Sequence, residues 1–376
     1  MNNGNMAGQA AVYGICASAT AFVRPPAAQI GKPRHPFRAA LRRLLLLGLA
    51  LTGLQAGAGE EVLNENSYRF GDGLRVPGTN LTLGGYATAG YEDQRHAPAR
   101  SALDNVSLFL WWEGDGRWKF FSEFDYENLL SSRSSAREED EPYLALERIY
   151  VDYALTDTSS LRAGKFLTPI GRWNLIHATP LVWTSSRPLV TVSTFPTNVT
   201  GLMLSGTLGG SEYSLYTSSG AEIRPNHTLD PFSEVIGAHL TLPTLAGLQV
   251  GLSYAAFEQK KSEGENKELF GVDFVWSKNR YEVSGEGVYR FSNNGSAWEE
   301  KGAFVQAVAP LTAKLYAVGR YEYFRKSRET LATELWVTGI NYRLTPAVVL
   351  KAEWIGSRNN TIGAPEGLLS SVSILF

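Results

Sequence analysis

Period-two alternation of apolar and polar residues, repeated along almost the whole chain, is the feature that most limits its fold. Such alternation gives a β-strand one apolar face and one polar face, and no helical period of any length interrupts it. We expect sixteen strands, near residues 80–92, 103–113, 117–129, 143–155, 161–166, 199–208, 212–219, 234–242, 248–257, 268–277, 280–290, 298–309, 313–324, 332–344, 348–356 and 368–376. The sequence therefore predicts an all-β, antiparallel architecture.

The connections between these segments alternate between short and long. Short turns such as Gly114-Asp115-Gly116 and Lys278-Asn279 take every second place, and longer polar loops take the others. Short turns at one end and long loops at the other are typical of transmembrane β-barrels, whereas a soluble β-sandwich has no reason for this asymmetry. An even strand number, with both ends of the chain on the periplasmic side, agrees with a barrel.

The polar faces of the expected strands carry charges of both signs. One strand has Lys119, Glu123, Asp125 and Glu127 together, opposite an aromatic face, and another has Glu282, Glu286 and Arg290 together. A Lys or Arg that faced lipid at mid-bilayer would cost about 2–4 kcal/mol, so these faces indicate a wet lumen. The alternative is the solvated outer face of a soluble sheet. A barrel of sixteen strands is wide enough to hold an aqueous channel.

The N-terminal region has the three parts of a secretory signal peptide. Arg38, Arg42 and Arg43 are basic, residues 44–54 are apolar, and Ala56-Gly57-Ala58 is a suitable cleavage site. We expect residues 1–59 to be removed, residues 60–79 to be a periplasmic lead-in, and residues 80–376 to form the barrel. The true start lies downstream of Met1, or the signal has an extended basic region. The single cysteine, Cys16, falls in the removed part, so the mature chain has no disulfide.

The C-terminal segment ends on an aromatic residue. Leu368, Val372, Ile374 and Phe376 alternate with small or polar residues. This ending resembles the closing strand of bacterial outer-membrane β-barrels, although the buried last strand of a soluble sandwich would give a similar pattern. The resemblance implies that the insertion machinery of the outer membrane recognises Phe376, and that lipid and lipopolysaccharide surround the barrel.

One long loop, residues 167–198, differs from the others. It contains no Asp or Glu, it includes Arg172, His177 and Arg187, and Lys165 lies just before it. Its many Leu, Ile, Val and Trp residues also need burial, and a loop of this length usually has a packed or functional role. Folding of this third external loop into the barrel would bury the apolar residues on the wall and place the cations in the pore.

Residues 161–174, which include Gly164-Lys165-Phe166 and Pro169-Ile170-Gly171, resemble a segment of the phosphate-selective porin O and P family. Leu83-Gly84-Gly85-Tyr86 near the start of the mature chain and the sixteen-segment layout are similar too. The resemblance implies a homotrimer whose inward-folded third loop forms the constriction. Phosphate preference in this family depends on an arginine ladder and a lysine cluster. This chain lacks the dense basic cluster, so a phosphate pore does not follow from the resemblance.

We expect Lys165, Arg172 and Arg187 to form the anion-contacting constriction. The polar strand faces supply the rest of the expected lumen wall, namely Lys119, Glu123, Asp125, Arg148, Asp152, Arg162, Glu282, Glu286, Arg320 and Lys351. For each cation the plain alternative is a structural ion pair between loop and wall. The two roles are compatible, because loop cations opposite wall anions create a transverse field.

Motifs for catalysis are absent. The histidines are scattered singly, without the spacing of a zinc site, and no Gly-rich phosphate loop precedes a helix. We therefore expect no enzyme, no cofactor and no metal, and the formal charge of -2 argues against a nucleic-acid partner. Two functions remain open. One is a passive pore for small hydrophilic solutes, favouring anions, phosphate-type anions among them. The other is a surface-interaction or structural barrel whose lumen is plugged by the third loop.

Overall fold

The computed structural model describes residues 68–95, 97–114, 116–133, 141–176, 178–220, 222–223, 230–262, 264–292 and 299–376. The expected signal peptide and the side chains of His96 and His177 lie outside these ranges. Within the described part of the chain, no helix is both long and apolar enough to cross a lipid bilayer.

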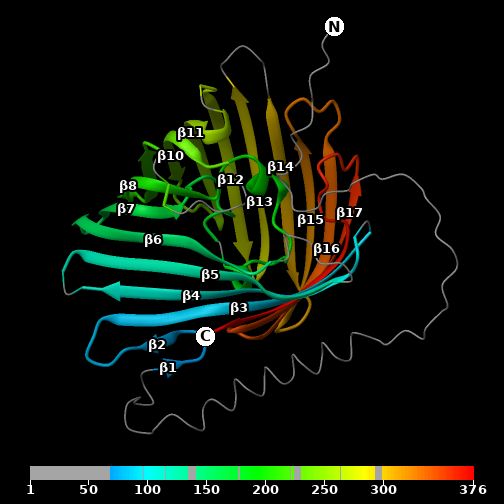
Figure 1. The fold of residues 1–376 in the computed structure, drawn as a ribbon, viewed down its shortest axis with the longest axis horizontal. Coiled ribbons are helices and arrows are strands. Elements are labelled where there is room, and N and C mark those ends of the chain that lie inside the picture. Colours follow the sequence, from blue (N-terminus) through cyan, green and yellow to red (C-terminus); the bar gives the residue numbers. More distant parts are fainter. Residues whose placement is uncertain are drawn as a thin grey trace, which may run out of the picture.

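Sixteen antiparallel strands form a closed barrel (Figure 1). They are β3 (Leu81–Gln94), β4 (Arg100–Glu113), β5 (Trp118–Arg133), β6 (Tyr143–Thr156), β7 (Ser159–Leu167), β8 (Asn198–Leu208), β9 (Ser211–Ser218), β10 (Phe232–Thr241), β11 (Leu248–Gln259), β12 (Lys267–Lys278), β13 (Tyr281–Ser292), β14 (Glu300–Pro310), β15 (Leu315–Arg325), β16 (Thr333–Thr345), β17 (Val348–Arg358) and β18 (Gly367–Leu375). Each strand pairs with its neighbours in sequence. All sixteen expected strands are confirmed, with ends that differ by a few residues.

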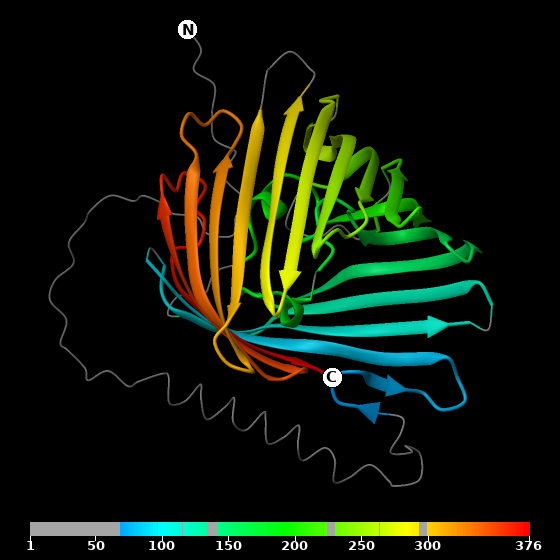
Figure 2. The same ribbon diagram turned by 180° about the vertical axis from the view of Figure 1, so that it is seen from behind.

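The barrel closes where β18 pairs with β3, from Gly367 opposite Gln94 to Leu375 opposite Tyr86. Phe376 extends this seam, because its N–H donates to the Gly85 carbonyl and its own carbonyl accepts the Gly85 N–H, both at 2.9 Å. The C-terminus accordingly lies beside β3 in both views (Figures 1 and 2). A closed sheet has no free edge, which satisfies the backbone of every strand.

A short hairpin precedes the barrel, inside the lead-in expected for residues 60–79. It consists of β1 (Tyr68–Arg69) and β2 (Gly73–Arg75), and β2 pairs with the start of β3 through Leu74 and Leu83. Gly73 has a φ of +87°, and a Cβ built there would lie 2.4 Å from the Leu83 carbonyl oxygen. Only glycine fits this close approach.

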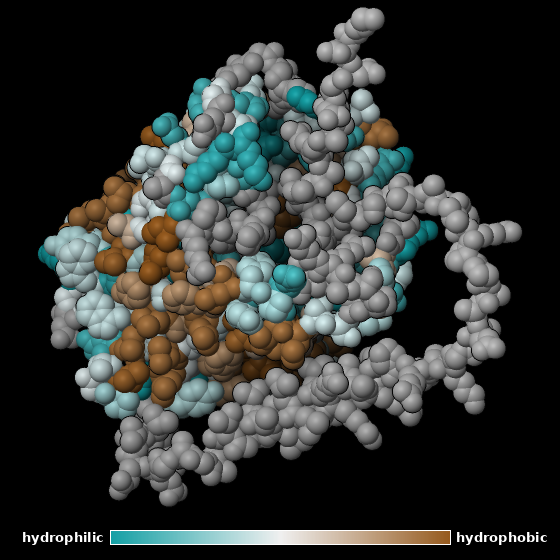
Figure 3. All heavy atoms as spheres, viewed as in Figure 1, coloured by the Kyte–Doolittle hydropathy of each residue, from teal (hydrophilic) through white to brown (hydrophobic). Residues whose placement is uncertain are grey.

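The two faces of the barrel wall differ as the alternation predicts. Large apolar side chains face outward, and Leu108, Ile236 and Trp354 are each more than half exposed. Figure 3 shows such side chains gathered over the region where Figure 1 has β3–β6. The opposite face buries charged side chains, including Glu123 on β5 and Arg320 on β15. In a membrane, lipid would cover the apolar face.

Buried apolar side chains form two clusters, both built around the β7–β8 connection. In the larger cluster, Ile170, Trp173 and Phe195 of the connection pack with side chains of β7–β14. In the smaller one, Leu189 packs with Phe324 and with side chains of β16–β18. The connection contains a 3-10 helix, η3 (Thr179–Leu181), and one helical turn, α2 (Leu189–Ser193).

Candidate functional site

The β7–β8 connection, residues 168–197, leaves and rejoins the wall at adjacent points. The Thr168 N–H donates to the Thr197 carbonyl at 2.8 Å, and the Thr168 hydroxyl donates to the Pro196 carbonyl at 2.6 Å. The Asn174 amide donates to the carbonyls of Thr168 and Thr197, at 2.9 and 3.0 Å. These bonds hold the two ends of the connection together. They do not fix the residues between the ends, which are held by contacts with other strands.

Three buried wall glutamates accept backbone N–H groups of the connection. Glu286 on β13 accepts from Trp173, Glu322 on β15 accepts from Leu189 at 2.6 Å, and Glu353 on β17 accepts from Ser185 at 3.0 Å and from Ser186 at 2.7 Å. Hydrogen bonds to a carboxylate are about twice as strong as neutral ones. The connection between β7 and β8 is therefore fastened to strands far from its own in the barrel order.

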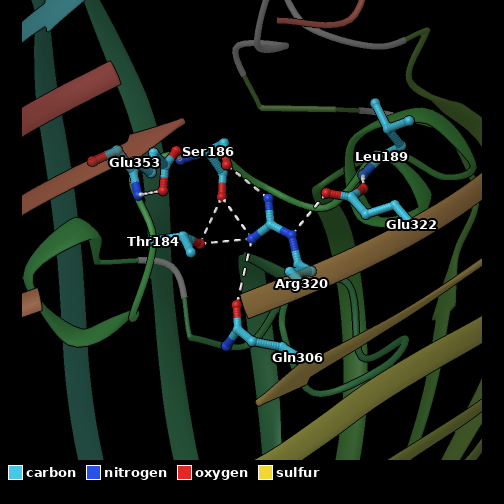
Figure 4. Close-up of polar contacts among 8 residues, drawn as sticks. Thr184, Ser186, Leu189, Gln306, Arg320, Glu322 and Glu353 are labelled. Atoms are coloured by element: carbon cyan, nitrogen blue, oxygen red, sulfur yellow. Dashed lines mark hydrogen bonds and ion pairs between the residues drawn. The ribbon is translucent and has the colours of Figure 1, made fainter. Parts of the chain in front are cut away.

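Arg320 on β15 is the centre of a polar network that joins the connection to the wall (Figure 4). Its guanidinium donates to the Thr184 hydroxyl at 2.6 Å, to the Ser186 hydroxyl at 2.7 Å and to the Ser186 carbonyl at 3.1 Å. Its Nε pairs with Glu322 at 2.7 Å, and Arg320 is only 3% exposed. Arg320 thus holds the connection and neutralises a wall carboxylate at the same time.

Lys351 on β17 makes a second attachment. Its buried ammonium donates to the carbonyls of Thr179 and Thr184, at 2.6 and 3.1 Å. Nearby on β16, the Asn341 amide donates to the Trp183 carbonyl at 3.0 Å. Two of the three N–H donors of Lys351 are therefore engaged by carbonyls of the connection.

On β5–β7 the expected lumen-wall charges form pairs with one another. Arg148 pairs with Glu123, and Arg162 makes a two-pronged pair with Asp152 at 2.7 and 2.8 Å. The guanidinium of Arg162 also stacks 3.7 Å from the centre of the Tyr150 ring. Both pairs join neighbouring wall strands and not the connection to the wall, so they differ from the loop-to-wall pairs considered from the sequence.

Two of the expected constriction cations lie among carboxylates. Lys165 is fully buried, and the charges acting on its ammonium are Glu222 and Glu147. Arg187 is half-buried, with its guanidinium 5.6 Å from the centre of the Trp173 ring. Burial lowers the pKa of Arg187, while Tyr86 and Glu147 oppose this shift. Arginine stays ionised under such shifts because its ordinary pKa exceeds 12.

Arg172 has a different setting. It is exposed, and its guanidinium donates to the amide oxygen of Gln249 on β11 at 2.9 Å. Among the three expected constriction cations, Arg172 is therefore the one that is open to solvent and bonded to a neutral partner. Lys119, also exposed, pairs with Glu113 at 2.9 Å near the β4–β5 turn.

Asp125, Glu127 and Glu147 form an acidic group near Arg187. One carboxylate oxygen from each of the three lies within 4.8 Å of the other two. The hydroxyl of Ser107 donates to Asp125, and the charges of Lys165 and Arg187 act on Glu147. Lys165 and Arg187 therefore oppose part of the repulsion that the neighbouring carboxylates exert on Glu147.

A cavity of about 180 Å³ lies between the connection and strands β12, β13, β14 and β16. Its charged lining consists of Arg172, Glu282, Glu286 and Arg343. The carboxylate of Glu282 accepts the Trp183 indole N–H at 3.0 Å, and the Arg343 guanidinium lies 4.4 Å from the centre of the Trp183 ring. Glu282 and Glu286 were expected in the lumen wall, and both lie here beside the connection.

Several functional contacts were missed from the sequence. Glu353 holds the connection, Asn341 and Gln249 bond to it, and Arg343 lines the cavity; Glu322, which also holds it, was placed on the polar face with Arg320 by the alternation but was not given this role. The alternation contained the same kind of signal for Glu353 as for Glu322. Glu322 follows Arg320 by two residues and Glu353 follows Lys351 by two, so each shares a strand face with an expected wall cation.

No protein-family model and no curated protein matches the sequence. Solved structures do match the fold. OmpF of Salmonella typhi in complex with daunomycin has a TM-score of 0.59 at 10% identity, covering 80% of this chain and 98% of that one. An anion-selective porin from Comamonas acidovorans has a TM-score of 0.55 at 12% identity, covering 79% and 98%. The fold is that of the outer-membrane porins. The outer membrane channel DcaP of Acinetobacter baumannii is a further match, with a TM-score of 0.57 at 10% identity, covering 79% and 97%.

Proposed function

We propose that this protein is an outer-membrane porin, a passive aqueous channel for small hydrophilic solutes. In this proposal the β7–β8 connection is the third external loop, and it folds into the lumen to form the constriction. One observation carries the proposal. Glutamates on β13, β15 and β17 accept backbone N–H groups of a connection that starts at β7, and a loop folded into a closed barrel could reach all three strands.

The channel favours anions, in our proposal, through Arg172. This guanidinium is exposed and bonded to a neutral amide, with Glu282 and Glu286 in the lining of the same cavity, whereas Lys165 and Arg187 are less exposed and lie among carboxylates. Charges in a narrow space of low dielectric act several times more strongly than charges in wide, wet regions. Phosphate-type anions belong to the solutes that such a constriction would admit. Its positive field is weaker than the sequence alone suggested, because two of three cations are compensated.

The mature protein begins near residue 60 after removal of its signal peptide, with residues 60–79 as a periplasmic lead-in and residues 80–376 as the barrel. It assembles as a homotrimer surrounded by lipid and lipopolysaccharide. The insertion machinery recognises Phe376. The position of Phe376 beside Gly85 at the closing seam supports a role for it in assembly.

A second function is favoured by a specific observation. The apolar side chains of the connection contribute to two buried clusters that together touch β7–β18. A connection that fills so much of the interior suits a plugged barrel that serves as a surface-interaction or structural protein.

Swelling of liposomes that contain the purified protein separates the two functions. A passive pore admits neutral solutes at rates that fall with solute size, so the liposomes should swell faster in a pentose than in a disaccharide. Liposomes that swell no faster than protein-free ones in any solute would favour the plugged barrel. The same measurement on a variant that lacks Ile170–Thr194 shows whether the barrel without this part of the connection admits solutes.

A further inference from the structure

The cavity between the connection and strands β12, β13, β14 and β16 combines two kinds of lining. Arg172 and Arg343 bring guanidinium groups, and Ile176, Phe274 and Phe304 bring apolar surface. Pockets that bind small molecules have this combination of an apolar lining with a few placed polar groups. The cavity therefore has the character of a binding site rather than of a packing defect.

Hydrogen bonding inside the cavity favours a negatively charged ligand. The carboxylates already have donors, since Glu282 accepts from Trp183 and Glu286 accepts from the Trp173 backbone. The Nε of Arg343 is buried and has no acceptor among the described residues. A buried N–H without a partner is unfavourable, and a ligand carboxylate that accepted this N–H would remove the penalty.

The size of the cavity limits the ligand. An apolar cavity of about 150 Å³ is known to take one benzene molecule, and this cavity measures about 180 Å³. It therefore has room for one six-membered ring with a small charged group attached. The aromatic rings of Phe274 and Phe304 are suitable neighbours for such a ring, because offset or edge-to-face contacts stabilise aromatic pairs.

We propose that this cavity binds small aromatic monocarboxylates of about the size of benzoate. The carboxylate lies against Arg343 and is also drawn to Arg172, and the ring lies among Ile176, Phe274 and Phe304. The inference rests on the proposed channel function in one respect only: in a channel, the cavity is a site that a solute occupies on its way through the pore. The binding itself requires just the folded barrel.

Equilibrium dialysis of labelled benzoate against the folded full-length protein in detergent tests the site without any conductance measurement. We expect saturable binding at about 20 mM salt that weakens at high salt, as screening predicts. Arg343→Gln should lower the affinity at least tenfold. Ser284→Phe, which fills the cavity from β13 without changing a charge, should abolish binding. Arg117→Gln, at an exposed arginine of the β4–β5 turn, is the matched control and should have no effect.

Three competitors test the charge sign. Unlabelled benzoate should displace the label, whereas benzyl alcohol and benzylamine should not. Equal displacement by benzylamine or benzyl alcohol, absence of saturable binding, or unchanged affinity in both cavity variants would overturn the proposal. A heat-modifiable band on gels shows that each variant is folded. Benzoate binding without conductance would contradict the proposed channel and support the proposed binding site. Conductance without benzoate binding would support the channel and contradict the binding site.

Discussion

Replacing Arg320 by methionine should release the central part of the β7–β8 connection while leaving the barrel closed. The substitution removes three hydrogen bonds to Thr184 and Ser186 and leaves Glu322 without its cation. Removing one partner of a buried ion pair costs about 3–5 kcal/mol. Because 1.4 kcal/mol is about a factor of ten, local opening of the connection should become about two to four orders of magnitude more frequent. Sheet hydrogen bonds are untouched.

Amide hydrogen exchange followed by mass spectrometry measures this opening. The N–H groups of Ser185, Ser186 and Leu189 donate to wall glutamates, so peptides containing them should exchange slowly in the native protein and much faster in Arg320→Met. Arg325→Met is the matched control on the same strand. Arg325 pairs with Glu299 at 3.4 Å in a partly exposed setting, where a pair contributes about 0–1 kcal/mol. Unchanged exchange in Arg320→Met, or an equal increase in Arg325→Met, would refute the fastening role of Arg320.

Three further outcomes are expected. An unheated detergent sample should migrate differently from a boiled one on gels, because a closed barrel resists unfolding; identical migration would contradict the closed fold. Reversal potentials in a dilute KCl gradient should show that chloride permeates better than potassium, and Arg172→Glu should weaken or invert this preference. Arg187→Glu should change the preference less, because Arg187 already lies among carboxylates. Potassium preference in the native channel would show that wall carboxylates dominate. Deletion of Phe376 should reduce the yield of assembled barrel, measured by the heat-modifiable fraction in outer membranes, and an unchanged yield would exclude a role in insertion.

The strands and their faces could be predicted because a membrane barrel repeats one simple constraint. Each strand must place apolar side chains against lipid and tolerates polar side chains inside. The alternation alone therefore assigns Tyr321 to the outer face and Arg320 to the inner face. Connection lengths then order the strands, because antiparallel neighbours need only short turns. The closing pair of β18 with β3 follows from the even strand number.

The partners of individual charges could not be predicted, because they depend on contacts between distant segments. For Lys165, the sequence does not reveal that the charges acting on it come from Glu147 on β6 and Glu222 in the β9–β10 loop. Gly164 precedes it with a φ of +134°, where a Cβ would lie 2.2 Å from the Ile149 carbonyl oxygen. The alternation of apolar and polar residues does not reveal such a local irregularity. Likewise, nothing in the sequence joins Ser186 to both Arg320 and Glu353.

Single-channel recording in planar bilayers tests the central claim most directly, with native protein compared to a variant lacking residues 170–194. The ends left by this deletion can be joined, because Thr168 and Thr197 already share a hydrogen bond of 2.8 Å. We expect discrete conductance steps for the native protein and larger steps for the shortened one, since the connection is proposed to narrow the lumen. Equal conductance steps in the two proteins would place the constriction elsewhere. The absence of conductance steps from both would contradict the proposed channel function.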